Sequence, residues 1–191
     1  MINKGVPIEL ANVIDKIIDV EGGNKPNGGY TNDAADRGGE TKYGITKSTW
    51  RANGWSGPII DAPRELAETI YYLRYIVEPG FDLIYDISAR VGMELIDTGV
   101  NMGPGRPSIW LQDWLNAFNN GQQYGPDLVV DGKIGKQSAN RLREFIIHRG
   151  QDGSMVLLKA LNGSQNARYL EIVNANKSQR RFAYGWVKER G

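Results

Sequence analysis

The feature that most constrains the fold is the distribution of helical periodicity, which leaves room for only a very small sheet. Residues 8–21 predict an amphipathic helix, because apolar residues recur there at helical spacing: Leu10, Val13, Ile14, Ile17 and Ile18. Gly22 and Gly23 end this helix. Residues 24–42 are rich in Gly, Asn, Asp and Thr, so they can hold at most a short hairpin, around residues 30–31 and 41–45.

Helical patterning dominates the rest of the chain. It predicts helices over residues 46–52, 63–76, 81–101, 104–118, 136–148, 154–176 and 178–188, with a turn-rich segment over 119–135. Asp61 is placed to cap the helix over 63–76. The chain is therefore expected to be mainly α, with a helical body and a small loop or β-hairpin element near the N-terminus.

Composition removes several classes of site. There are no cysteines, which excludes disulfides, thiolate metal sites and a cysteine nucleophile. The single histidine, His148, lies in a segment typical of a helix end, where the helix dipole favours it, so a structural role is expected. The net charge of +1 argues against capture of nucleic acid by bulk charge. No metal and no cofactor are expected.

Glu21 is the first candidate for chemistry. It follows Ile17 by four residues and Ile18 by three, so on a helix its side chain shares their face. It also lies in the last turn, where the negative end of the helix dipole opposes a carboxylate. Both effects favour the protonated carboxyl that a glycosidase uses to protonate a leaving glycosidic oxygen. The alternative is a solvated glutamate that ends an ordinary helix.

A run of carboxylates follows in the loop. Asp33, Asp36 and Glu40 lie within eight residues, and one of them could face Glu21 as a base, nucleophile or electrostatic stabiliser. A calcium loop is a competing interpretation, but the regular ligand spacing and the closing bidentate glutamate are missing. An acidic turn, in which aspartates bond their own backbone, is a further alternative for at least one of them.

Three side chains next to the carboxylates carry groups that suit a sugar. Thr41 and Thr46 could position a water or a sugar hydroxyl. Tyr43 could stack on a sugar ring through its apolar face.

Together these segments resemble the signature of glycoside hydrolase family 108, which comprises phage endolysins and related bacterial N-acetylmuramidases with a lysozyme-like fold. The matching segments are residues 21–23, 30–46 and 97–103. Residues 111–116 and 130–135 resemble the predicted peptidoglycan-binding region that accompanies this family. One departure stands out: the family tyrosine normally follows the two glycines directly, whereas here residues 24–29 intervene before Tyr30.

The resemblance implies a lysozyme-like catalytic part over residues 1–102 and a helical C-terminal part over 103–191, expected to form one compact unit. It implies that Glu21 is the essential acid. In the broader phage-lysozyme pattern an aspartate precedes the Gly-Ile of the second hairpin strand by eight residues, which favours Asp36 over Asp33 as its partner. Thr41 is expected to take part in catalysis. The residues expected to bind substrate are Asp33, Tyr43, Thr46 and Asn101.

The expected function is an endolysin-type muramidase that hydrolyses the β-1,4 bond between N-acetylmuramic acid and N-acetylglucosamine in peptidoglycan and so lyses bacteria, working as a monomer. A lytic transglycosylase on the same bond, or a non-catalytic module for wall binding or secretion, is the alternative.

The two ends of the chain bear on where the protein is expected to act and which further surface it is expected to contact. Residues 1–20 lack the hydrophobic region of a signal peptide, and no apolar run is long enough to span a membrane, so synthesis in the host cytoplasm and action in the periplasm are expected. Residues 177–190 mix cations with aromatics. They are expected to pack through Phe182 and Trp186, and a contact with an anionic outer-membrane surface is compatible with that packing.

Overall fold

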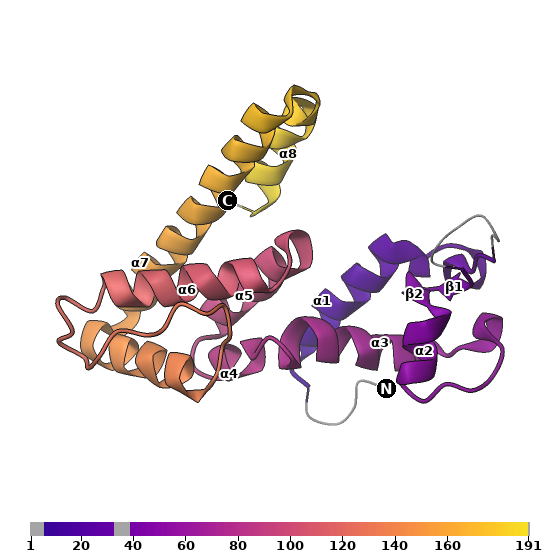
Figure 1. Cartoon of the computed structure of the whole chain (residues 1–191), viewed down its shortest axis with the longest axis horizontal. Helices are drawn as coiled ribbons and strands as arrows, with labels where there is room; N and C mark the ends of the chain where they lie inside the picture. The colour runs from indigo at the N-terminus through magenta and orange to yellow at the C-terminus, as the bar shows by residue number, and fades with distance from the viewer. Residues whose placement is uncertain (1–5, 33–38, 191) are drawn as a thin grey trace. The chain divides into compact units, whose positions relative to one another are not determined.

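The computed structural model describes residues 6–32 and 39–190 (Figure 1). The chain forms two compact units, Met1–Ile76 and Val77–Gly191. The boundary expected from the family resemblance, after residue 102, stays a prediction. In the described part of the chain, no helix is both long enough and apolar enough to cross a membrane.

The first unit contains a short hairpin among helices. Its described elements are α1 (Ile8–Ile18), the π-helical turn η1 (Asp19–Gly23), the 3-10 turn η2 (Pro26–Gly29), β1 (Thr41–Lys42), β2 (Ile45–Thr46), α2 (Lys47–Ala52), the 3-10 turn η3 (Ile59–Asp61), α3 (Arg64–Tyr72) and most of the π-helical turn η4 (Leu73–Val77). α1 packs against α3 (Figure 1). The buried side chains on these two helices include Leu10, Ile14, Ile18, Ala67 and Ile70. Their helical spacing explains why both segments form amphipathic helices.

The hairpin has a two-residue turn that fixes its register. The register places Thr41 opposite Thr46 and Lys42 opposite Ile45. Tyr43 and Gly44 form the turn with φ of 53° and 71°, and such left-handed pairs match the twist of a two-residue hairpin. Thr31 extends the pairing, because its backbone exchanges bonds of 3.0 and 2.9 Å with Thr41.

Lys42 fastens the hairpin to the segment that precedes α3. Its side chain is buried, and Nζ donates hydrogen bonds to the carbonyls of Ile60 at 2.6 Å and Ala62 at 2.8 Å. Burial lowers the pKa of Lys42, and the nearby charge of Asp61 opposes that change. The buried ammonium is thus held by carbonyl acceptors, as a buried cation requires.

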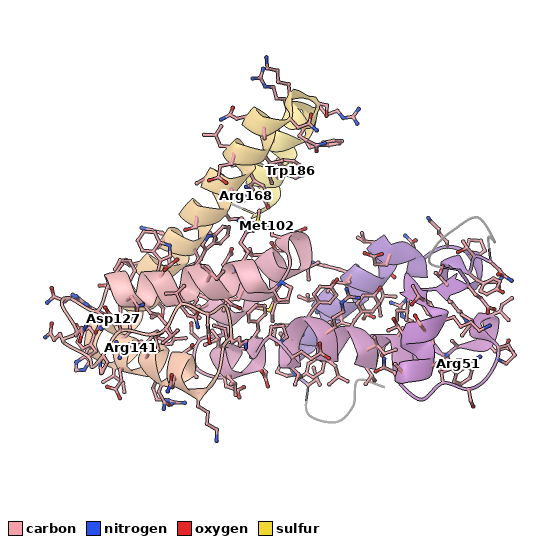
Figure 2. The ribbon with its side chains drawn as sticks, viewed as in Figure 1. Arg51, Met102, Asp127, Arg141, Arg168 and Trp186 are labelled. Atoms are coloured by element: carbon pink, nitrogen blue, oxygen red, sulfur yellow. The ribbon has the colours of Figure 1, made fainter. Side chains whose placement is uncertain are left out.

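The second unit is helical throughout its regular elements. These are α4 (Phe81–Tyr85), α5 (Ala89–Met102), α6 (Gly105–Ala117), α7 (Lys136–Ala175), the 3-10 turn η5 (Lys177–Gln179) and α8 (Arg180–Arg190). α5 packs against α4, α6 and α7, and α8 folds back along the end of α7 (Figure 1). The turn-rich segment between α6 and α7 is held by Arg141, whose guanidinium donates to the carbonyl of Pro126 at 2.7 Å (Figure 2).

The expected fold class, a mainly α lysozyme-like body with a small hairpin near the N-terminus, is confirmed. Two details differ: the helix expected over 81–101, and the cap expected from Asp61. The helix expected over 81–101 is two helices, because α4 folds back on α5 where Gly92 lies against the backbone of Tyr85. The two helices expected over 136–148 and 154–176 are present, as the two parts of α7, which are separated by a kink at the non-helical Gly150, where φ is 64°. Asp61 does not cap α3, which begins at Arg64 after Pro63.

A polar cluster lies between α5 and α7 inside the second unit. Thr98 donates to Glu94 Oε1 at 3.1 Å and accepts from Gln165 at 2.9 Å. The Asn162 amide, with its nitrogen turned to the carboxyl, donates to both Glu94 oxygens at 2.8 and 2.9 Å. Burial raises the pKa of Glu94 to about 7; the bond from Thr98 opposes this change and the charge of Asp97 adds to it.

This cluster predicts how the second unit responds to pH. Folded Glu94 keeps its proton up to a pH of about 7, whereas a carboxyl with the ordinary pKa of 4.5 loses it earlier. The folded state therefore binds more protons between these values, so the contribution of Glu94 to the free energy of unfolding falls as pH rises through that window. Glu94→Gln should remove this contribution, measured by urea unfolding at several pH values.

The exposed Glu78 provides the control, since Glu78→Gln should retain the wild-type dependence. If the wild type and Glu94→Gln lose stability in parallel as pH rises, the assigned protonation of Glu94 is wrong.

Candidate functional site

Glu21 lies in a π-helical turn that only glycine allows. α1 ends at Ile18, and η1 carries the chain on from Asp19 to Gly23. A Cβ at Gly23 would stand 2.5 Å from Ile18 Cγ2 and 2.8 Å from its carbonyl oxygen, and Gly22 has a φ of 107°. A larger residue at either position would strain the turn. π-helical turns of this kind occur often at functional sites.

The turn also corrects the expected surroundings of Glu21. Ile17 and Ile18 are buried, but Glu21 is exposed, because it lies in the wider turn after α1 has ended. The expected partial burial of Glu21 against the isoleucines is therefore wrong. Its side chain is accessible from solvent.

Glu21 meets the hairpin and α3 at Gly44. A Cβ built on Gly44 would stand 2.8 Å from both Cβ and Oε2 of Glu21, and 3.0 Å from the hydroxyl oxygen of Tyr71. Tyr71 is buried on α3 and donates its hydroxyl hydrogen to the carbonyl of Tyr43 at 2.8 Å. Burial and the charge of Glu21 raise the pKa of Tyr71 well above its ordinary value. The hydroxyl therefore stays protonated at any working pH.

The six residues 24–29 tie the turn of Glu21 to the hairpin. The Gly28 carbonyl accepts the backbone N–H of Tyr43 at 2.8 Å, and the Tyr43 ring lies so close to Gly28 that a Cβ there would overlap it. A Cβ on Gly29 would stand 2.9 Å from the carbonyl oxygen of Gly22. The segment that departs from the family pattern is thus a packed element beside Glu21. Stacking of Tyr43 on a sugar stays a prediction and would use the exposed part of the ring.

Glu40 stabilises the loop through contacts with two neighbouring side chains. It accepts a hydrogen bond from the Tyr30 hydroxyl at 2.9 Å and pairs with Lys47 Nζ at 3.1 Å. The contact with Lys47, followed by that with Tyr30, lowers the pKa of Glu40 and keeps it ionised. The other two loop carboxylates, Asp33 and Asp36, lie outside the described residues and remain the predicted partners of Glu21.

The remaining predicted site residues make local contacts. Thr41 Oγ1 lies 2.7 Å from Thr31 Oγ1, at the point where the strand pairing begins. Thr46 caps α2, with Oγ1 accepting the backbone N–H of Thr49 at 3.4 Å. Asn101 is an exposed residue of α5 in the second unit, and its amide donates to a carbonyl one turn earlier at 2.7 Å. Among the described residues, no group of three or more potential ligand side chains could hold a metal.

Sequence reasoning missed Tyr71 and Lys42. Tyr71 follows Ala67 by four residues and Ile70 by one, on the buried face of α3. A buried tyrosine normally has a hydrogen-bond partner, which is a signal that was present in the sequence. Nothing in the pattern around Lys42 indicated that its ammonium would be buried.

The comparisons with known proteins match two family models to successive parts of the chain, and the first match extends past residue 76 into the second compact unit. Residues 14–103 match the family model described as Glycosyl hydrolase 108, and residues 106–191 match the one described as Predicted Peptidoglycan domain. No curated protein matches the chain. Among solved structures the chain is similar to the one titled "Structure of Brucella abortus SagA", with 21% sequence identity, a TM-score of 0.53, and coverage of 95% of this chain and 88% of that chain. This likeness supports the fold.

The contact at Gly44 can be tested by adding a single methyl group. Gly44→Ala should lose about 1–2 kcal/mol of stability from its left-handed backbone, and about 1–3 kcal/mol more from overlap with Glu21 and Tyr71. Gly54→Ala is the matched control, because Gly54 has a φ of 89° and nothing within 4 Å of its Cβ position. Equal losses in the two variants, measured by urea unfolding, would show that Glu21 and Tyr71 do not crowd Gly44.

Proposed function

Because residues 14–103 match the glycosyl hydrolase 108 family and residues 106–191 match a predicted peptidoglycan domain, we propose that this chain is a muramidase. The two domains identify a glycoside hydrolase that acts on the peptidoglycan of the cell wall. The proposed bond is the β-1,4 linkage between N-acetylmuramic acid and N-acetylglucosamine. The observation that carries the proposal is the exposed carboxyl of Glu21, which a glycine turn places near the buried, protonated hydroxyl of Tyr71.

The proposed mechanism uses two carboxyl groups. Glu21 protonates the leaving glycosidic oxygen, and Asp36 stabilises the oxocarbenium-like transition state or activates water. Thr31 and Thr41, which pair at the start of the hairpin, flank the segment that carries Asp36. Thr41 positions the water or a sugar hydroxyl. Asp33, Tyr43, Thr46 and Asn101 are proposed to contact the glycan.

The proposed biological role is that of an endolysin, with the catalytic part over residues 1–102 and a wall-binding part over 103–191. α8 is proposed to add contact with an anionic outer-membrane surface. Trp186 packs on Tyr169 of α7 at 5.2 Å between ring centroids (Figure 2). Phe182 stacks on Trp186 and is 42% exposed, and Tyr184 is 80% exposed. The same helix therefore has a packed side and an exposed side that carries aromatic groups.

Two alternatives differ in their products. A lytic transglycosylase would cleave the same bond with one glutamate and release 1,6-anhydro products without consuming water. A non-catalytic wall-binding module would release nothing. Mass spectrometry of digested sacculi distinguishes the three, and anhydro-muropeptides alone would contradict the hydrolase.

If Glu21 is the acid, replacing it should reduce turnover without reducing binding. Glu21→Gln removes the transferable proton, so turnover of purified sacculi should fall about 100- to 10,000-fold while binding to sacculi is unchanged. Glu65→Gln, an exposed glutamate on α3, is the matched control and should keep full activity. Release of reducing ends measures turnover, and co-sedimentation with sacculi measures binding. Lysis that survives Glu21→Gln would exclude Glu21 as the acid.

A proposed catalytic role of Thr41 can be distinguished from the structural role of its hydrogen bond with Thr31. Thr41→Val and Thr31→Val each remove the same 2.7 Å contact between hydroxyl groups. If Thr41 acts on the water or the sugar, its variant should lose at least about tenfold in kcat, the value of one hydrogen bond in the transition state, whereas Thr31→Val should lose less. Equal losses in steady-state assays would assign Thr41 a structural role only.

A further inference from the structure

Tyr71 places a buried hydroxyl beside the proposed acid, and the mechanism above does not use it. The side chain is 5% exposed, and its ring stacks on Tyr75 with centroids 5.9 Å apart and planes 8° apart. Stacking and burial fix the ring, so the hydroxyl oxygen has a defined position.

The one hydrogen of the Tyr71 hydroxyl already takes part in a hydrogen bond. It is donated to the carbonyl of Tyr43 at 2.8 Å, and the Tyr43 position is set by the hairpin turn. A hydroxyl has one hydrogen and two acceptor lone pairs, so the bond to Tyr43 leaves Tyr71 able to accept a hydrogen bond but not to donate a second one.

The Glu21 carboxyl lies near the Tyr71 hydroxyl, close enough for its charge to raise the pKa of Tyr71. Both Glu21 Oε2 and the Tyr71 oxygen lie within 3.0 Å of the point that a Gly44 Cβ would occupy. Because Gly44 has no side chain, no Cβ crowds the two oxygens. Burial keeps Tyr71 neutral, as does the charge of Glu21 itself.

We propose that Tyr71 is a positioning residue that accepts a hydrogen bond from the protonated Glu21 carboxyl and holds its proton ready for the leaving oxygen. The ionised carboxylate receives nothing from this hydroxyl, because the only hydrogen of the hydroxyl faces Tyr43. Tyr71 therefore favours the form of Glu21 that acts as an acid. This inference rests on the proposed role of Glu21.

Other charged and titratable groups lie on the elements around the Glu21 turn, and Tyr71→Phe leaves all of them in place. On the elements packed around the turn these are Asp19, Lys25, Lys42, Tyr43, Arg64, Arg74 and Tyr75. Asp19 is paired with Arg64 at 3.3 Å. Removing the neutral hydroxyl of Tyr71 changes none of these charges, so a change in the pH profile would report the lost acceptor.

The test compares Tyr71→Phe with Tyr75→Phe in the full-length protein. Each variant removes one hydroxyl from the stacked pair. Kinetics on soluble peptidoglycan fragments across pH should show the alkaline limb of the kcat profile of Tyr71→Phe moved to lower pH by about 0.5–1 unit. At neutral pH kcat should fall about three- to tenfold with KM unchanged. Tyr75→Phe should keep the wild-type limb. An unmoved limb in Tyr71→Phe, or the same shift in both variants, would overturn the proposal.

A second measurement does not depend on the folding of Tyr71→Phe. In protein with ¹³C-labelled tyrosine, the Cζ resonance of Tyr71 should change with pH at the midpoint of the Glu21 titration, and Glu21→Gln should abolish that change. A Tyr71 resonance insensitive to the Glu21 titration would overturn the proposal. Loss of hydrolysis in Glu21→Gln together with an unmoved Tyr71→Phe profile would reject only the role of Tyr71, whereas hydrolysis that survives Glu21→Gln would reject the proposed function.

Discussion

The meeting of Glu21, Gly44 and Tyr71 is the contact on which the proposed chemistry of the first unit depends. Three separate local structures bring the groups together: a π-helical turn after α1, a left-handed hairpin turn, and a buried position on α3. Each is local and each requires a particular residue, glycine in the two turns and a hydroxyl on the helix. Because Gly44 has no side chain, no Cβ crowds the carboxyl and the hydroxyl.

Other contacts in the first unit hold the hairpin, α3 and α1 in the positions that this contact requires. Lys42 fixes the hairpin to the chain before α3, and Arg64 joins α3 to α1 through Asp15 at 2.9 Å. Residues 24–29 fill the space between the turn of Glu21 and the hairpin, so an insertion relative to the family pattern became part of the packing. The second unit has a different kind of polar interior, in which Glu94 is surrounded by amide and hydroxyl donors.

The sequence predicted much of the fold and less of the site. Periodicity located most helices, because burial of an apolar face decides where an amphipathic segment forms a helix. It could not show the break between α4 and α5, which depends on the close approach of Gly92 to Tyr85. It also misplaced Glu21 on the isoleucine face, since a π-helical turn shifts every later side chain around the axis. Tyr71 and Lys42 were missed because their roles arise from contacts with residues distant in the chain.

The central claim is that this chain adds water across the glycosidic bond at N-acetylmuramic acid. Digestion of sacculi in water enriched in ¹⁸O, followed by mass spectrometry of the unreduced muropeptides, tests it most directly. The account predicts reducing ends at N-acetylmuramic acid that carry the isotope from the moment of cleavage. Products with 1,6-anhydro ends, or new reducing ends at N-acetylglucosamine, would contradict it.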